Sequence, residues 1–272
     1  MSIQFESLSF RYPGSGSEAL RGVSAEFDAG VVTLVTGMLG AGCSTLLLVA
    51  AGLAPRVTGG DRQGVVRTLG HDPESREGHH ALAGRVGLLL PTPWTQLSGM
   101  SYTVRDEVAF GPANLGWKRD QIADAVDQMM ALMRVEDLAQ RDPRTLSGGE
   151  LQRVMFAAVA AMDPDVFLLD EPTIELDPRG ARLVYDLLPQ LAQEKTVVIA
   201  STDLDRAVEV TGRALLLDRG RLVADGDPRE VLGSASAASM GCSTTIAGIM
   251  RSAGLEPVYP LTVHAALRRL GR

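Results

Sequence analysis

The chain has 272 residues, a formal net charge of −7 and a hydrophobic fraction of 45%. These values favour one large folded domain with appendages and exclude a disordered chain. The acidic balance argues against nucleic acid as a partner, because nucleic-acid binders present a basic face. Two cysteines cannot form a disulfide framework, and the sequence shows neither an apolar run of membrane-spanning length nor a signal peptide, so we expect a soluble protein in a reducing compartment.

The first third of the chain predicts strands around a glycine-rich loop. Residues 2–12 alternate apolar and polar side chains, which is the period of a half-buried strand. Residues 30–37 form a short apolar run with β-branched side chains, typical of a buried parallel strand. A helix over 44–53 follows. A strand, a glycine loop and a helix in this order are the context in which a phosphate-binding loop occurs.

The rest of the chain alternates predicted helices and strands. Apolar residues recur every three or four positions over 119–140 and predict an amphipathic helix (Ile122, Val126, Met129 and Met133). A second helix should run over 147–162 from a serine cap. The last third alternates strands and helices and therefore predicts a parallel α/β core. The expected elements are strands over 166–170 and 196–202, helices over 178–194 and 204–210, and a hairpin over 213–227. Residues 233–248 are rich in small side chains and predict a linker before a short tail.

The glycine-rich loop, TGMLGAGCST at residues 36–45, departs from the phosphate-binding pattern at one position. The pattern G-x-x-x-x-G-K-[ST] is met at Gly37, Gly42 and Ser44, but Cys43 stands where the lysine belongs. Cysteine offers phosphate at best a weak S–H donor. Alternatively, a thiol at a helix N-terminus could have a lowered pKa and be reactive.

Three further motifs occur in order: LSGGELQR at 146–153, VFLLDEPT at 166–173 and ELDP at 175–178. With the loop, they make the chain similar, over about residues 3–232, to the ATP-binding-cassette (ABC) ATPases. Within that family, DEVAFGPANLG at 106–116 and PLTVHAAL at 260–267 resemble the ATPase subunits of energy-coupling-factor (ECF) transporters, which import vitamins and transition-metal ions.

The resemblance implies a fold of class α/β: a P-loop NTPase (RecA-like) core with an antiparallel β subdomain and an inserted α-helical signature subdomain. It places the ABC ATPase domain at 1–232, with the helical subdomain at about 88–162. Residues 233–272 would then be a linker and a short C-terminal tail.

The resemblance also implies a site for ATP and Mg²⁺. Ser44 and Asp170 would hold Mg²⁺, and Glu171 would be the general base that polarises the attacking water. Tyr12 would stack on the adenine ring; the alternative is a surface tyrosine at a strand end. The phosphates would lie on the loop (Gly37, Met38, Leu39, Gly40, Ala41, Gly42, Cys43, Ser44 and Thr45).

LSGGE has a different implied role. In the family, two cassettes pack head to tail, and each signature covers the nucleotide held by the partner. The signature of this chain would therefore complete the partner's site, and Asp177 would contact the partner in the dimer. The alternative for SGGE is an ordinary capped helix start. The signature residues concerned are Ser147, Gly148, Gly149 and Glu150.

Three departures from the family pattern fall on this chain's own site. Besides Cys43, Pro91 stands where the family has a glutamine that contacts Mg²⁺ and water, and Thr202 stands where it has a histidine that contacts the γ-phosphate. Gln96 matches a different glutamine of the family string. With an intact signature, these losses imply a heterodimer in which this site binds ATP but hydrolyses it poorly.

The expected partners are a second ABC ATPase chain and a transmembrane coupling subunit, with the protein peripheral on the cytoplasmic face of the membrane. The helical subdomain would meet the membrane subunit. Trp94 would lie in a partner-facing loop or be buried, and Trp117 would be core.

Three alternatives stay open. The first is a non-hydrolysing pseudo-ATPase that acts as a nucleotide-binding scaffold, which the retained Glu171 disfavours. The second is a soluble non-transport cassette, a class that carries coiled-coil arms or zinc modules that this sequence lacks. The third is a homodimer whose two sites share the same defects.

Overall fold

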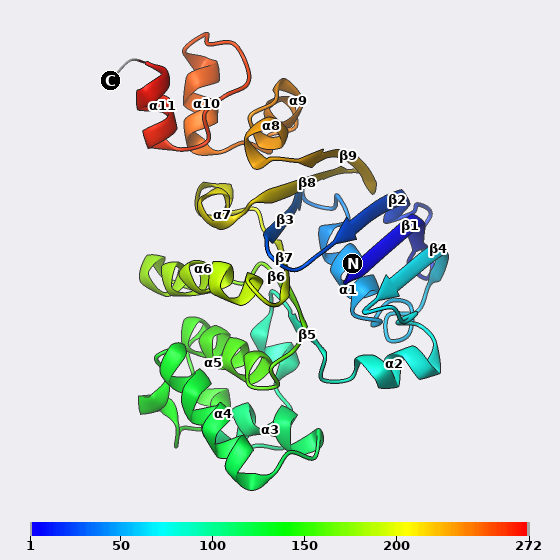
Figure 1. Ribbon diagram of the computed structural model, residues 1–272, viewed down its shortest axis with the longest axis vertical. Helices are drawn as coiled ribbons and strands as arrows, with labels where there is room; N and C mark the ends of the chain where they lie inside the picture. The colour runs from blue at the N-terminus through cyan, green and yellow to red at the C-terminus, as the bar shows by residue number, and fades with distance from the viewer. Residues whose placement is uncertain (1, 271–272) are drawn as a thin grey trace.

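The computed structural model describes residues 2–270 and is built on a six-stranded sheet (Figure 1). Strands β5, β6, β7, β3 and β8 run parallel, and β9 pairs antiparallel with β8 as the second arm of the predicted hairpin. The predicted parallel α/β core is confirmed. In sheet order the strands are β5 (Val86–Leu89), β6 (Val166–Asp170), β7 (Thr196–Ala200), β3 (Val32–Gly37), β8 (Arg213–Asp218) and β9 (Arg221–Gly226).

Helices cover both faces of this sheet. Along β6, Val166 and Leu168 belong to one hydrophobic core, whereas Phe167 and Leu169 belong to another. The first core includes α1 (Cys43–Ala50), and the second includes α6 (Pro178–Ala192) and α7 (Leu204–Val210). Because the strands are buried on both faces, they appear in the sequence as continuous apolar runs.

A separate three-stranded antiparallel sheet packs over α1. Its order is β2 (Leu20–Phe27), β1 (Ile3–Arg11) and β4 (Asp61–Thr68). Phe5 pairs with Ala25 on one side and Val66 on the other, and its side chain joins the core that contains Leu46 of α1. The antiparallel subdomain implied by the resemblance is therefore present.

A helical layer lies at the far end of the molecule from the C-terminus (Figure 1). Its helices are α3 (Val104–Asn114), α4 (Arg119–Leu132) and α5 (Gly148–Ala160), and α2 (Arg76–Leu82) precedes β5. Ser147 caps α5 as predicted. The prediction of one helix over 119–140 is wrong at its C-terminal end, because α4 stops at Leu132. Arg134 has a positive φ of 54°, which terminates the helix. A 3-10 turn (Glu136–Leu138) follows. Trp117 is half-buried rather than core.

The segment predicted as a linker forms helices. After α8 (Pro228–Leu232) come α9 (Ala235–Ser239), α10 (Thr245–Ser252) and α11 (Val263–Arg269). Ser234 and Thr244 cap α9 and α10. Ala237 and Ala247 of this segment are fully buried against the core that contains α6 and α7. The small residues that suggested a linker therefore allow close packing of these helices.

This packing predicts that α10 contributes to the stability of the cassette. Met250 is buried in the core that contains α6 and α7, whereas its neighbour Ile249 is 56% exposed. Met250→Ala should lower the free energy of unfolding by about 2–3 kcal/mol through lost burial and a cavity. The control Ile249→Ala should stay within about 0.5 kcal/mol. Chemical denaturation measures both; equal small effects would mean that α10 unfolds separately from the core.

Candidate functional site: two cavities on one chain

The glycine-rich loop lines a cavity of about 530 Å³, here named the loop cavity. It lies where β3, β6 and β7 end, because parallel strands present their carboxyl ends at one sheet edge. The structure brings together every residue that was predicted for this chain's own site. They are Tyr12, the loop residues Gly37 to Thr45, Pro91, Asp170, Glu171 and Thr202; Ala19, Ile174 and Ser201 also line the cavity and were missed.

Glycine is required at two positions of the loop. A Cβ on Gly37 would lie 2.3 Å from the carbonyl oxygen of Leu217 and 2.6 Å from the Cβ of Ala41. Gly42, the N-cap of α1, has a φ of 107°, and a Cβ there would lie 2.6 Å from the carbonyl oxygen of Ala19. Side chains at either position would push the loop away from β8 or β2. The pattern therefore marks real backbone constraints, independent of the missing lysine.

Cys43 begins α1 and lines the loop cavity as a neutral thiol. Burial, together with the nearby charges of Asp170 and Glu171, raises the pKa of the Cys43 thiol to about 12. The alternative of a reactive, low-pKa thiol is therefore contradicted, since burial outweighs any effect of the helix N-terminus. Of the described residues that line this cavity, none is a lysine or arginine. Its charged side chains are the two carboxylates.

Asp170 and Ser44 supply the oxygen donors of the loop cavity. Asp170 ends β6 and is only 3% exposed. The pKa of its carboxyl is raised to about 6, mainly by burial; a hydrogen bond from Ser44 opposes the rise, and the charge of Glu171 adds to it. A carboxylate beside a hydroxyl is a donor set that Mg²⁺ accepts, with water completing the coordination. These two residues would hold the ion, which would supply the positive charge that the loop lacks.

The raised pKa of Asp170 predicts a specific pH dependence of nucleotide binding. Mg²⁺ binds the carboxylate form, so affinity for Mg-ATP should be constant above about pH 7 and fall roughly tenfold per pH unit below about pH 6. Metal-free ATP should show the opposite sign, because protonation of Asp170 removes a repulsive charge. Titration with a fluorescent ATP analogue measures both curves. An Asp170→Asn variant that keeps the fall would assign it to another group.

Glu171 is fixed by donors at the end of β7. It has a left-handed backbone conformation, with φ 45°. The Thr202 N–H donates to its Oε1 at 2.8 Å, and the Ser201 hydroxyl donates to its Oε2 at 3.3 Å. The Tyr185 hydroxyl lies 3.3 Å from Ser201 Oγ. Thr202 therefore acts on Glu171 through its backbone. The only signal for Ser201 in the sequence is its place directly after β7, at the sheet edge that Asp170 shares.

Tyr12 lines the loop cavity. Its hydroxyl lies 3.1 Å from the Thr45 hydroxyl of α1, and its ring meets Phe10 edge to face at 4.9 Å. The ring is therefore held beside the loop by a hydrogen bond and a buried aromatic neighbour. This placement fits an aromatic surface next to a bound base better than a free surface tyrosine.

The two candidates for the glutamine position have different places. Pro91 lines the loop cavity, where its ring can donate no hydrogen bond. Gln96 instead closes the end of β5: its Oε1 accepts from the Leu90 N–H at 2.7 Å, and its Nε2 donates to the Leu88 carbonyl at 2.9 Å. Because both ends of the amide are engaged by the backbone, Gln96 does not replace the missing glutamine.

A second cavity of about 600 Å³, here named the signature cavity, is lined by Ser147, Gly148, Gly149 and Glu150. Ser147 and Glu150 form a reciprocal capping box at the start of α5, and the Ser147 N–H donates to Glu150 Oε2 at 2.8 Å. Asp177 caps α6 by accepting from the Gly180 N–H at 2.7 Å. The residues described as lining the two cavities do not overlap. The two cavities are therefore separate.

Three arginines on the signature cavity were not predicted from the sequence: Arg134, Arg153 and Arg179. Arg153 is engaged, since its guanidinium donates to the carbonyls of Met133 and Arg134 at 3.0 and 2.7 Å. The signature cavity therefore carries cations, in contrast to the loop cavity. Arg153 ends the LSGGELQR motif, whereas nothing in the local sequence distinguishes Arg134 and Arg179 from surface arginines.

Comparison with known proteins identifies the family. The family model described as ABC transporter matches residues 20–174. The Methanothermobacter thermautotrophicus energy-coupling factor transporter ATP-binding protein EcfA is 34% identical over 279 aligned positions, covering 99% of this chain and 88% of its own length. The chain therefore belongs to the ABC transporter family, among its ATP-binding cassette ATPases.

Other relatives differ in length or in degree of likeness. An ABC transporter ATP-binding protein of Methanosarcina mazei is 38% identical over 85% of this chain, and the chain spans only 39% of that relative's length. The structure of cbiO1 from Clostridium perfringens, part of the ABC transporter complex cbiONQ, has a TM-score of 0.74 and 27% identity, covering 93% of this chain and 99% of its own. These likenesses support the cassette fold over nearly the whole chain.

Proposed function

We propose that this chain is the ATP-binding subunit of an ECF-like ABC importer and pairs with a second, different cassette. Its own site binds ATP with Mg²⁺ but hydrolyses it poorly, and its signature completes the partner's hydrolytic site. One observation carries the proposal: all three departures, Cys43, Pro91 and Thr202, line the loop cavity, whereas the signature cavity retains its family residues.

Electrostatics explain why the nucleotide site of this chain would hydrolyse ATP poorly. A lysine 4 Å from a phosphate charge contributes about 4 kcal/mol at an effective dielectric of 20, before its desolvation is subtracted. The loop cavity instead presents Asp170 and Glu171 to the nucleotide. ATP would therefore enter as its Mg²⁺ complex, held by backbone N–H groups of the loop, by Ser44 and by the Tyr12 ring. Glu171 would remain as a general base without the glutamine and histidine that position the reaction.

The membrane subunit would dock on the helical layer. A groove of about 480 Å³ lies between α3 and α5 and is lined by Phe110 and Leu115, and Trp94 nearby in the chain is 47% exposed. Among residues 2–270, no helix has the length and apolar character needed to cross a bilayer. We propose that contact through this groove holds the protein on the cytoplasmic face of the membrane.

The proposed division of the chain follows from these surfaces. Residues 1–232 would form the ABC ATPase domain, with the helical subdomain at about 88–162 carrying both the docking groove and the signature. Residues 233–272 would form a C-terminal appendage, its helices α9 and α10 packed on the cassette rather than extended as a linker.

The competing function is a nucleotide-binding scaffold without turnover. The cation-free loop cavity and the engaged Glu171 carboxylate favour it for this chain's own site. The two functions differ at the signature, which a scaffold does not need.

ATP hydrolysis separates the two functions. The protein should be nearly inert alone and active when mixed with the second cassette of its transporter, with turnover at least about a hundredfold higher, equivalent to about 2.7 kcal/mol of barrier. Phosphate release measures the rate. An inert mixture would favour the scaffold, and full activity of the chain alone would mean that its own site is competent.

A further inference from the structure

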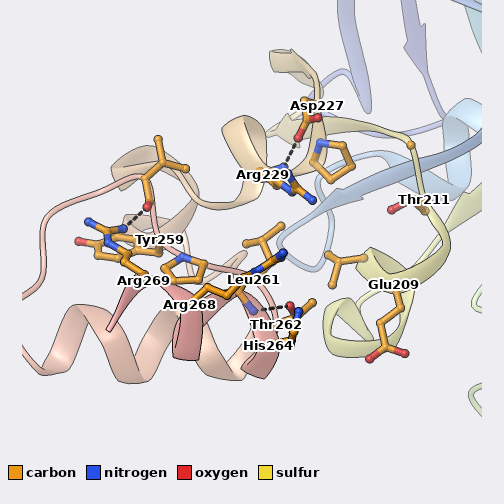
Figure 2. Close-up of a pocket in the computed structure, with 16 residues that line it drawn as sticks. Glu209, Thr211, Asp227, Arg229, Tyr259, Leu261, Thr262, His264, Arg268 and Arg269 are labelled. Carbon is orange, nitrogen blue, oxygen red and sulfur yellow. Dashed lines mark hydrogen bonds between the residues drawn. The ribbon is translucent and has the colours of Figure 1, made fainter. Parts of the chain in front are cut away.

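A cavity of about 750 Å³ lies between the cassette and its C-terminal segment, here named the C-terminal cavity (Figure 2). Its walls come from the end of α7, the start of α8 and residues 258–269. Among the described lining residues, none belongs to the loop cavity or the signature cavity. The function proposed above does not use this cavity.

Two arginines line the C-terminal cavity without an anionic partner. Arg229 comes from α8 and Arg268 from α11, and both side chains extend toward the space between these helices (Figure 2). Within residues 2–270, neither guanidinium makes an ion pair or a side-chain hydrogen bond. Both residues are exposed, so water screens their mutual repulsion, and an anion placed between them would be attracted by both guanidinium groups.

The other charged groups of the cavity are placed differently. Asp227 caps α8, its Oδ1 accepting from the Arg229 backbone N–H at 2.7 Å. Glu209 is exposed on α7, and Figure 2 shows its carboxylate directed away from the arginines. Arg269 donates to the carbonyls of Val258 and Glu256 and so braces the C-terminal segment. Neither acidic residue neutralises Arg229 or Arg268.

A hydroxyl without a partner is buried in the wall of the cavity. Thr211 lines the cavity, and its Oγ1 is buried with no hydrogen-bond partner among the described residues. Buried hydroxyls without a partner are costly and rare in folded proteins. The Thr262 hydroxyl, by contrast, is engaged as the cap of α11. Thr211 Oγ1 is closed off from the open cavity, so an occupant with acceptor oxygens would bind through the two arginines.

We propose that the C-terminal cavity binds a small polyanion, a molecule with phosphate or carboxylate groups, that fastens residues 258–269 to the cassette. A guanidinium offers paired N–H donors that match either group bidentately. The cavity volume falls in the usual range for small-molecule sites. Because the occupant would bridge α8 and α11, its binding would reduce local opening of the C-terminal segment.

Hydrogen exchange of residues 258–269 tests the proposal with tripolyphosphate and citrate as separate probes, each against sodium chloride at equal ionic strength. A probe at ten times its Kd should slow exchange of this segment about tenfold. Protection by tripolyphosphate alone supports a phosphate ligand, protection by citrate alone supports a carboxylate ligand, and protection by both supports a general polyanion site.

Substitutions locate the effect. Arg229→Gln and Arg268→Gln should each abolish the protection, and Arg268→Lys should weaken it, because lysine keeps the charge but not the fork. The control Arg182→Gln, on α6 with its side chain 80% exposed, should leave it unchanged. The proposal would be overturned if neither tripolyphosphate nor citrate protected residues 258–269. It would also be overturned by protection confined to residues 37–45, or by protection that survives both glutamine substitutions.

Discussion

Ser147→Arg in this chain should abolish ATP hydrolysis by the mixed dimer, lowering turnover at least about a hundredfold. Ser147 lines the signature cavity at the start of α5, where a partner's nucleotide would lie in the proposed dimer. An arginine side chain would fill the space that the nucleotide needs. Phosphate release by the mixture measures the loss. Binding of ATP to this chain alone should not change, because its loop cavity shares no described lining residue with the signature cavity.

The matched control for this substitution is Ser234→Arg. Ser234 caps α9 as Ser147 caps α5, accepting from the Ala237 N–H, and it lines neither the loop cavity nor the signature cavity. Both substitutions lose a cap worth about 1 kcal/mol of stability. A mixed dimer with Ser234→Arg should keep its turnover. Equal losses with both variants would mean that cap loss, rather than a blocked cavity, explains the result.

Cys43→Lys should tighten binding of ATP to this chain by about tenfold to a hundredfold, since part of the roughly 4 kcal/mol attraction survives desolvation of the lysine. The added cation would lie in a cavity whose charged groups are Asp170 and Glu171. Affinity for metal-free ATP should rise most, because Mg²⁺ then has less charge to supply. Fluorescence titration with and without Mg²⁺ measures both values.

Two neutral variants separate charge from shape at this position. Cys43→Ser keeps the size of the thiol, and Cys43→Met approximates the length of lysine without its charge. Neither should tighten binding. An equal gain with Cys43→Met would assign the effect to packing. Cys43→Lys should not restore hydrolysis by this chain alone, because Pro91 and Thr202 still line the cavity without the groups that contact Mg²⁺, water and the γ-phosphate.

Sequence reasoning succeeded where one local pattern sets one local geometry. The close approach of Gly37 to Leu217 and the positive φ of Gly42 explain why the loop could be placed despite Cys43. The capping box of α5 was likewise readable, because Ser147 and Glu150 satisfy each other within one turn. Such features depend on neighbours in the chain and not on distant packing.

Features that depend on distant packing were missed. The small residues of α9 and α10 have the composition of a linker, and only burial of Ala237 and Ala247 against the cassette makes them part of a core. Ser201 reaches Glu171 because β6 and β7 are in register, which no motif records. Burial raises the pKa of the Cys43 thiol, whereas its position at the start of a helix had suggested a lowered pKa.

The asymmetry of the two sites is tested most directly by substituting the general base in each cassette in turn. With Glu171→Gln in this chain, the mixed dimer should keep its ATP turnover within about twofold. The equivalent substitution in the second cassette should lower turnover by about a hundredfold or more, the usual contribution of a general base. Equal large losses from the two substitutions would show that both sites hydrolyse ATP and would contradict the account.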